Sequence, residues 1–148
     1  MNPQTLDHAG IAARVPHSGA MCLLHALHAW SAEHIECSAI SHLDPANPLR
    51  TQGLLLAPNA IEYAAQAMAL HGTLCAPPGS APTPGFLVSV RGVRLCVPRL
   101  DEVAGELRVA AHKLAGEARQ ALYAFSVRDA QGGLLVEGRA TVIINALP

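Results

Sequence analysis

The segment that most constrains the fold of this chain is residues 57–72, where alanines and large apolar residues occupy most positions. Pro58 suits the first turn of a helix, because the N–H that it lacks would be unpaired there anyway. Gly72 suits the left-handed position that ends many helices. A helix that is apolar on all sides has to be buried, and this one is too short to span a membrane. The sequence therefore predicts one buried helix from about residue 58 to residue 71.

The other segments predict an antiparallel sheet around that helix. Residues 34–41 partly alternate between polar and apolar side chains, as a half-buried strand does. After a proline-rich loop that follows the helix, turn residues separate strand-like runs at 86–97, 103–114, 120–127 and 134–145. Short strands separated by turns pair antiparallel. Because a strongly curved sheet is needed to cover such a helix, we expect an α+β fold in one domain, residues 1–148.

Composition excludes several classes of protein. The chain has 148 residues, of which 51% are hydrophobic and 14% charged, and its net charge is −1, so neither disorder nor a nucleic-acid or membrane partner is expected. No basic segment followed by an apolar run opens the chain, which predicts a cytoplasmic protein. The cysteines are too scattered for a zinc site or a disulfide framework, and we expect buried free thiols at Cys22, Cys37, Cys75 and Cys96.

Two polar residues interrupt the apolar helix. Glu62 and Gln66 are four residues apart, so they lie on one helix face, one turn from each other. A carboxylate among apolar side chains is unfavourable unless it is paired or used. One interpretation is a partly exposed Glu62 that the helix dipole stabilises in the first turn. The other is a catalytic carboxylate that Gln66 orients by a hydrogen bond.

Three segments resemble one enzyme family. Residues 62–66, Glu-Tyr-Ala-Ala-Gln, resemble the E-x-x-A-Q signature of hot-dog-fold 3-hydroxyacyl-acyl-carrier-protein dehydratases. Residues 15–24 resemble the segment of that family in which Pro-His precedes Leu-Leu, and residues 42–48 resemble its H-F-P-G-N-P loop. More closely, residues 47–50 and 61–69 look like a predicted-dehydratase branch that is found with aryl polyene biosynthesis. The resemblance covers nearly the whole chain.

This resemblance implies a hot-dog fold, a long central helix wrapped by a curved antiparallel sheet, and dehydration of a 3-hydroxyacyl thioester to the trans-2-enoyl thioester. His42 matches the family's catalytic His and Glu62 its catalytic acid, which meet across a dimer interface. A neutral His accepts a proton from Cα near pH 7. A Glu in apolar surroundings retains the proton that the departing hydroxyl needs. Because acyl carrier protein holds the substrate on its phosphopantetheine arm, no separate cofactor and no metal are expected.

The resemblance also suggests residues that contact the substrate. The family has a glycine at the position of Ala57, and its N–H binds the thioester carbonyl. Ala57 keeps an N–H, whereas Pro58 has none. The further candidates for substrate contact are Gln66, Asn59 and His17.

Basic residues after the helix allow two interpretations. Arg91, Arg94 and Arg99 fall in and after one strand-like run. They suit the docking of an acidic carrier protein or of a phosphopantetheine phosphate, and they equally suit an ordinary solvated face. His71, near the end of the helix, suits a favourable interaction with the helix C-terminus.

Two alternatives to a dehydratase remain open at this point. The hot-dog fold also supports acyl thioesterases, because a fold does not determine a function. The longer loop after His42 also fits a catalytically weak subunit that stabilises a paralogous dehydratase. We therefore expect a homodimer or a heterodimer with a paralogue. The sequence does not indicate the acyl chain length, a preference for aryl or alkyl groups, or which carrier protein is used.

Overall fold

The computed structural model describes residues 5–15, 19–77, 85–117 and 119–144. The helical elements are α1 (His8–Ala12), the 3-10 helices η1 (Gly19–Met21), η2 (Ser41–Leu43) and η3 (Ala57–Asn59), and α2 (Ala60–Cys75). The strands are β1 (Ala26–Trp30), β2 (His34–Ala39), β3 (Gly85–Leu95), β4 (Leu107–Gly116), β5 (Gln120–Arg128) and β6 (Leu134–Ile144).

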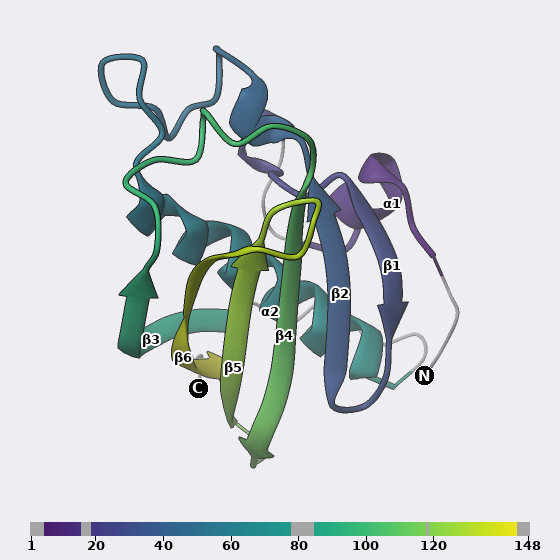
Figure 1. Cartoon of the computed structure of the whole chain (residues 1–148). Helices are drawn as coiled ribbons and strands as arrows, with labels where there is room; N and C mark the ends of the chain where they lie inside the picture. The colour runs from purple at the N-terminus through teal and green to yellow at the C-terminus, as the bar shows by residue number, and fades with distance from the viewer. Residues whose placement is uncertain (1–4, 16–18, 78–84, 118, 145–148) are drawn as a thin grey trace.

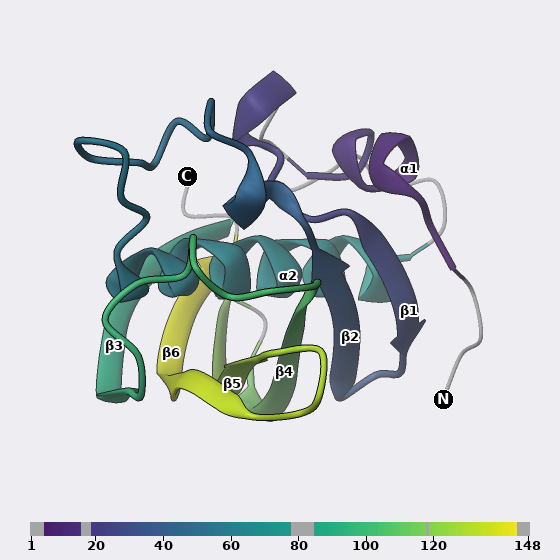
Figure 2. The ribbon, with the colours of Figure 1, turned by 45° about the horizontal axis from the view of Figure 1, so that its top comes forward.

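The strands form one six-stranded sheet in the order β1-β2-β4-β5-β6-β3, and all the pairings are antiparallel. The helix α2 lies behind the sheet in Figure 1 and runs across its strands in Figure 2. One long helix on a curved antiparallel sheet confirms the predicted α+β architecture. β3 is the first strand after α2 in the chain, yet it pairs with the last strand, β6, so this edge of the sheet is formed by strands that are remote in sequence.

The central helix begins as predicted and ends later. Pro58 lies in η3, which leads directly into α2. The prediction that Gly72 ends the helix is wrong, because α2 continues to Cys75. The helix ends where Ala76 adopts an extended conformation (φ −69°, ψ 154°), as a residue that precedes a proline prefers. Among the described residues, no helix is long and apolar enough to cross a membrane.

Burial along α2 is uneven. The buried side chains of α2 are Ala60, Tyr63, Ala64, Gln66, Ala67, Met68, Leu70 and His71. On the sheet, alternate residues of β5 from Ala121 to Val127 are buried against the helix. The remaining side of α2, with Glu62, Ala65 and Ala69, is only half-buried. We predicted that the sheet encloses the helix on all sides. In the single chain it does not, because the side of α2 with Glu62, Ala65 and Ala69 remains partly accessible to solvent.

The cysteines and the strand boundaries also differ in part from expectation. All four cysteines are free, as predicted, but only Cys22 and Cys37 are buried, whereas Cys75 and Cys96 are exposed.

The strand expected at 103–114 begins only at Leu107. The residues before it form a loop in which Val103 faces the turn that contains His42. This displacement matters because the loop, rather than a strand, supplies a hydrogen-bond acceptor to that histidine.

Candidate active site

His42 lies in the short helix η2 and is fully buried. Its Nε2 is 3.1 Å from the carbonyl oxygen of Val103, and because a carbonyl only accepts, Nε2 carries the proton. Its Nδ1 is also buried and has no hydrogen-bond partner among the described residues. Burial lowers the pKa of His42 below its ordinary value, although the nearby backbone of Val103 and Gly105 favours the charged ring; the charge of Arg50 acts in the same direction as burial. The ring is therefore held neutral, with a free lone pair on Nδ1.

Arg50 holds the backbone around His42. Its guanidinium donates to the carbonyl oxygens of His42 (3.0 Å), Asp44 (3.0 Å) and Gly53 (2.8 Å). Its Nη1 also lies 4.0 Å from a carboxylate oxygen of Asp101. One side chain thus joins three points of a long loop, which is what the five donors of an arginine allow. The sequence does not indicate this role of Arg50, because its partners are backbone carbonyls that no side-chain motif reveals.

Arg99 is tied to the same loop rather than left free for a carrier protein. Its guanidinium contacts the carboxylates of Asp101 and Glu102. Asp101 also accepts a hydrogen bond from the N–H of Leu55 (2.9 Å). The guanidinium of Arg99 holds the pKa of Asp101 well below its usual range, so the carboxylate stays ionised. These contacts give Arg99 a structural role that neither of the two interpretations included, and its part in docking stays a prediction.

A chain of hydrogen bonds joins the His42 turn to α2. Asn47 Nδ2 donates to Tyr63 Oη (3.1 Å), and the hydroxyls of Tyr63 and Ser41 are 2.8 Å apart. Because the Ser41 hydroxyl donates to the carbonyl of Leu23 (2.8 Å), the hydroxyl of Tyr63 donates to Ser41. Burial raises the pKa of Tyr63, which keeps its proton in place. These hydrogen bonds therefore all point the same way, from Asn47 through Tyr63 and Ser41 to Leu23, and they fix the turn that contains His42 against α2.

The structure gives Gln66 a role other than the predicted orientation of Glu62. Gln66 is fully buried, its Oε1 accepts from the N–H of Leu23 (2.8 Å), and its Nε2 donates to the carbonyl of Met21 (2.6 Å). The amide of Gln66 thus pairs with one backbone N–H and one backbone C=O of the segment before β1, which leaves neither group without a partner. Gln66 therefore fastens the segment before β1 to α2, and it is not exposed to a substrate.

The start of the helix offers fewer free N–H groups than the family pattern implies. The N–H of Ala57 donates to the carbonyl of Pro98 (3.1 Å), and that of Asn59 donates to the carbonyl of Leu56 (3.0 Å). Pro58, between them, has no N–H. Ala57 is also fully buried. The predicted thioester contact of Ala57 would therefore require it to give up an existing hydrogen bond, and the side chain of Asn59 likewise donates to Leu56.

Glu62 lies in the first turn of α2, on its half-buried side. The ring of His42 makes no hydrogen bond to Glu62 within this chain, since its partner is the carbonyl of Val103. The pairing of these two residues thus remains a prediction that concerns two subunits. His17, the other predicted substrate contact, lies outside the described residues.

His71 has a different role from the predicted one. It is buried, with Nδ1 accepting from the hydroxyl of Tyr123 (2.8 Å) and Nε2 donating to the carbonyl of Ser31 (2.8 Å). The helix continues past it to Cys75, so His71 does not lie at the C-terminus. Its ring instead joins the end of β1 and the middle of β5 to α2.

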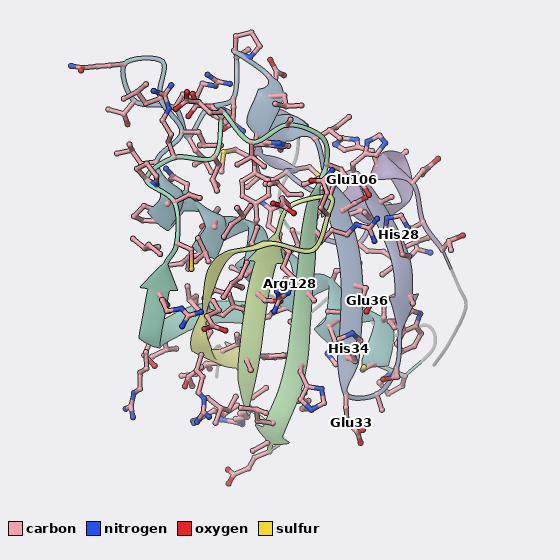
Figure 3. All side chains as sticks on the ribbon, in the orientation of Figure 1. His28, Glu33, His34, Glu36, Glu106 and Arg128 are labelled. Atoms are coloured by element: carbon pink, nitrogen blue, oxygen red, sulfur yellow. The ribbon has the colours of Figure 1, made fainter. Side chains whose placement is uncertain are left out.

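The outer face of the sheet carries polar side chains and a hollow of about 460 Å³. Figure 3 shows His28, Glu36 and Arg128 on this face, above different strands. These groups already have partners, because His28 bonds the hydroxyl of Ser38 (2.9 Å) and Arg128 donates to the carbonyl of Gly132 (3.1 Å). This hollow lies on the side of the sheet opposite the helix, away from His42.

Comparisons with known proteins place this geometry in a family. The model of the ApeP-like family, described as ApeP dehydratase, matches residues 9–146. A search of curated proteins finds no significant match. The structure is similar to a chain of the ApeI:P dehydratase heterocomplex from Xenorhabdus doucetiae, with a TM-score of 0.81, 24% identity and 90% of each chain covered.

Thioesterases share the same fold at lower similarity. A thioesterase from Haemophilus influenzae has a TM-score of 0.68 and 16% identity, with 99% of this chain and 96% of that chain covered. A mutant thioesterase from Pseudomonas aeruginosa has the same TM-score and identity, with 97% of each chain covered. These likenesses show the hot-dog fold, whereas the family match covers nearly the whole sequence. The chain therefore belongs to the ApeP-like family of dehydratases.

Proposed function

We propose that this dehydratase acts on a 3-hydroxyacyl thioester held on acyl carrier protein, and that His42 is its base. The observation that carries the proposal is the ring of His42, which is neutral, buried and unpaired at Nδ1 among the described residues. In the reaction, Nδ1 takes a proton from Cα, a carbon–carbon double bond forms, and the β-hydroxyl leaves as water with a proton from an acid. General acid–base help of this kind is typically worth about 10² to 10⁴ in rate.

The acid in this proposal is Glu62. It is a carboxyl group on the half-buried side of α2, which one chain leaves partly open. Because the ring of His42 makes no hydrogen bond to Glu62 within the described chain, the proposal pairs each residue with a group from a second subunit. The ApeI:P dehydratase from Xenorhabdus doucetiae is a heterocomplex, and this likeness supports a heterodimer with a paralogue over a homodimer.

The carrier protein belongs to the proposal as the source of the substrate. The acyl group arrives on a phosphopantetheine arm, so the chemistry needs no separate cofactor. Arg91 and Arg94 on β3 are exposed, whereas Arg99 is half-buried and bonded to Asp101, and the two exposed arginines support docking of an acidic surface or a phosphate. The family supports a product destined for an aryl polyene. Four free cysteines support a cytoplasmic location, because oxidising compartments favour disulfides.

One observation favours a second candidate function, that of a catalytically weak subunit. At the start of the helix, the N–H groups of Ala57 and Asn59 are engaged and Pro58 has none, so none of these three residues offers a free N–H to a thioester carbonyl. In addition, the ring of His42 is inaccessible to solvent in the single chain. In this alternative the chain stabilises a paralogous subunit, which performs the reaction with its own groups.

The decisive experiment incubates the purified chain, alone and with a paralogous hot-dog chain from its own source, with 3-hydroxyacyl-carrier-protein and acyl-carrier-protein thioesters. An enoyl thioester as product supports the proposal, and free acid indicates a thioesterase. Dehydration that survives His42→Ala in the complex identifies this chain as the weak subunit. If none of the mixtures yields any product, the assigned substrate class is wrong.

A further inference from the structure

The edge strand β3 contains a bulge that turns two arginines to the same face. Arg91 lies opposite Arg139 on β6, and Arg94 lies opposite Glu137. In a regular strand, residues three apart point to opposite faces. Here three residue steps on β3 span two on β6, and Gly92 has φ of +58°, a conformation that glycine adopts readily. The bulge therefore places both arginines on one face.

That face is the outer one, away from α2. Arg139 lies opposite Ala124 on β5, between the buried residues Tyr123 and Phe125 that point towards the helix. Because strand residues alternate between faces, Ala124 points outward, and its neighbours in the same row do too. The row continues across the sheet from Arg139 to Arg91 at the edge.

The charges on this face are not balanced. Arg91 and Arg139 are exposed cross-strand neighbours, and like charges in that position repel. Neither has an ion-pair partner among the described residues, whereas Arg94 is 3.4 Å from the carboxylate of Glu137. The strand itself carries no acidic residue. The net charge of the whole chain is only −1, so this concentration of positive charge is local to the edge.

The same strand has the features of an interface. It lies at the end of the sheet, and within the described residues no strand pairs with its outer edge (Figure 1). Apolar side chains on it are unusually exposed, namely Leu87, Val88, Val93 and Leu95. Leu87 and Leu95 lie opposite the buried residues Val142 and Val136. An unpaired, apolar edge is a surface that another strand covers.

We propose that the arginine cluster of Arg91, Arg94 and Arg139 selects the partner of this edge. The inference rests on the heterodimer of the proposed function. Two copies of β3 paired antiparallel about a two-fold axis would bring the same faces, and hence both clusters, side by side. Such a homodimer juxtaposes like charges, which disfavours it. The partner that fits is a paralogous hot-dog chain whose edge strand is apolar on the helix side and carries carboxylates on the outer side.

The test compares self-association with association to a charge-reversed copy. We would measure dimer affinities by analytical ultracentrifugation for the parent chain, for the Arg91→Glu/Arg139→Glu variant, and for an equimolar mixture. The mixed pair should form at least about tenfold more tightly than either pure pair at low salt. Raising NaCl from about 50 mM to about 500 mM should tighten the parent homodimer and weaken the mixed pair, because salt screens both repulsion and attraction.

Two controls separate charge from other effects. Arg108→Glu reverses an exposed charge on β4, away from the edge, and should leave all affinities unchanged. The neutral variant Arg91→Gln/Arg139→Gln should strengthen self-association without creating attraction, and circular dichroism should show parental folding for each variant. A parent homodimer that is tight at low salt and insensitive to salt would overturn the inference, as would a mixed pair no tighter than the pure ones. Dehydration is assayed separately, so a failure of either proposal is recognised independently.

Discussion

Two buried histidines of this chain have nearly the same exposure and different partners. His42 and His71 are 0% and 1% exposed, and burial lowers the pKa of both. In His71 both ring nitrogens have partners, the hydroxyl of Tyr123 and the carbonyl of Ser31. In His42 only Nε2 has one. A buried polar atom without a partner costs stability, and in His42 that atom is a basic ring nitrogen, which suits it to accept a proton.

Replacing His42 should reduce activity more than any other change proposed for this chain. In the complex with its partner, His42→Ala should lose about 10² to 10⁴ in dehydration rate, because no other described group offers an unpaired nitrogen there. Stopped assays of enoyl-thioester formation measure this loss. The matched variant, His71→Ala, should unfold more easily and yet retain its activity per folded molecule. Equal losses of activity in the two variants would remove the distinction between the histidines.

Glu62 tests the second half of the proposed pair. Glu62→Gln keeps shape and hydrogen bonding but cannot deliver a proton, so kcat should fall more than substrate affinity. Combined with His42→Ala, the loss should be smaller than the product of the single losses, since both residues serve one transition state. Single-turnover kinetics measures the chemical step. If the Glu62→Gln complex stays fully active, the carboxylate is structural and another group supplies the proton.

Arg50 distinguishes positioning from electrostatics at His42. Arg50→Gln removes three hydrogen bonds and a positive charge, so kcat should fall about tenfold. The charge of Arg50 lowers the pKa of His42, so its loss raises that pKa, and the acid limb of kcat/KM moves to higher pH. Arg50→Lys keeps the charge, so it should lower kcat with a smaller displacement of that limb. A limb that stays in place in both variants would limit Arg50 to a structural role.

Tyr123 tests whether the hydrogen bonds of His71 contribute to stability alone. Tyr123→Phe leaves Nδ1 of His71 buried and unpaired, which should lower the free energy of unfolding by about 1–3 kcal/mol. Urea denaturation followed by circular dichroism measures this change. Tyr63→Phe is the matched variant, since it removes a hydroxyl that fixes the His42 turn. It should lower activity as well as stability, whereas Tyr123→Phe should affect stability alone.

The smallest effect is on the pH dependence of folding. Because burial lowers the folded-state pKa of both histidines, the unfolded chain binds more protons once the pH falls through about 6.5. Their contribution is fully present above that pH and is lost as the pH falls towards the folded-state values. Urea titrations between about pH 7.5 and pH 5 measure the slope. His71→Gln should reduce it, and an unchanged slope would show that His71 is not held neutral.

Local sequence pattern was sufficient to predict the main helix and the antiparallel strands. The apolar run before Gly72 predicted a buried helix, and the strand-like segments separated by turns predicted antiparallel pairing. Both predictions rest on side-chain periodicity, which decides which faces of an element can be buried. The motif around Glu62 and the loop at His42 were sufficient to indicate a dehydratase, which the family match confirms. The end of the helix was not predicted correctly, since Pro77 and its effect on Ala76 outweighed Gly72.

The hydrogen-bond partners of the buried polar groups depend on long-range packing, which local pattern does not specify. Gln66 bonds to the segment before β1, the N–H of Ala57 bonds to Pro98, and His71 bonds to Tyr123, all distant in sequence. Periodicity specifies the face on which a residue lies, but a hydrogen bond depends on the position of a group from another element to within a few tenths of an ångström. The pairing of β3 with β6, which brings Arg91 beside Arg139, is likewise a long-range contact. The spacing of residues within β3 does not predict this pairing, because its register is set only when β3 and β6 come together in the folded sheet.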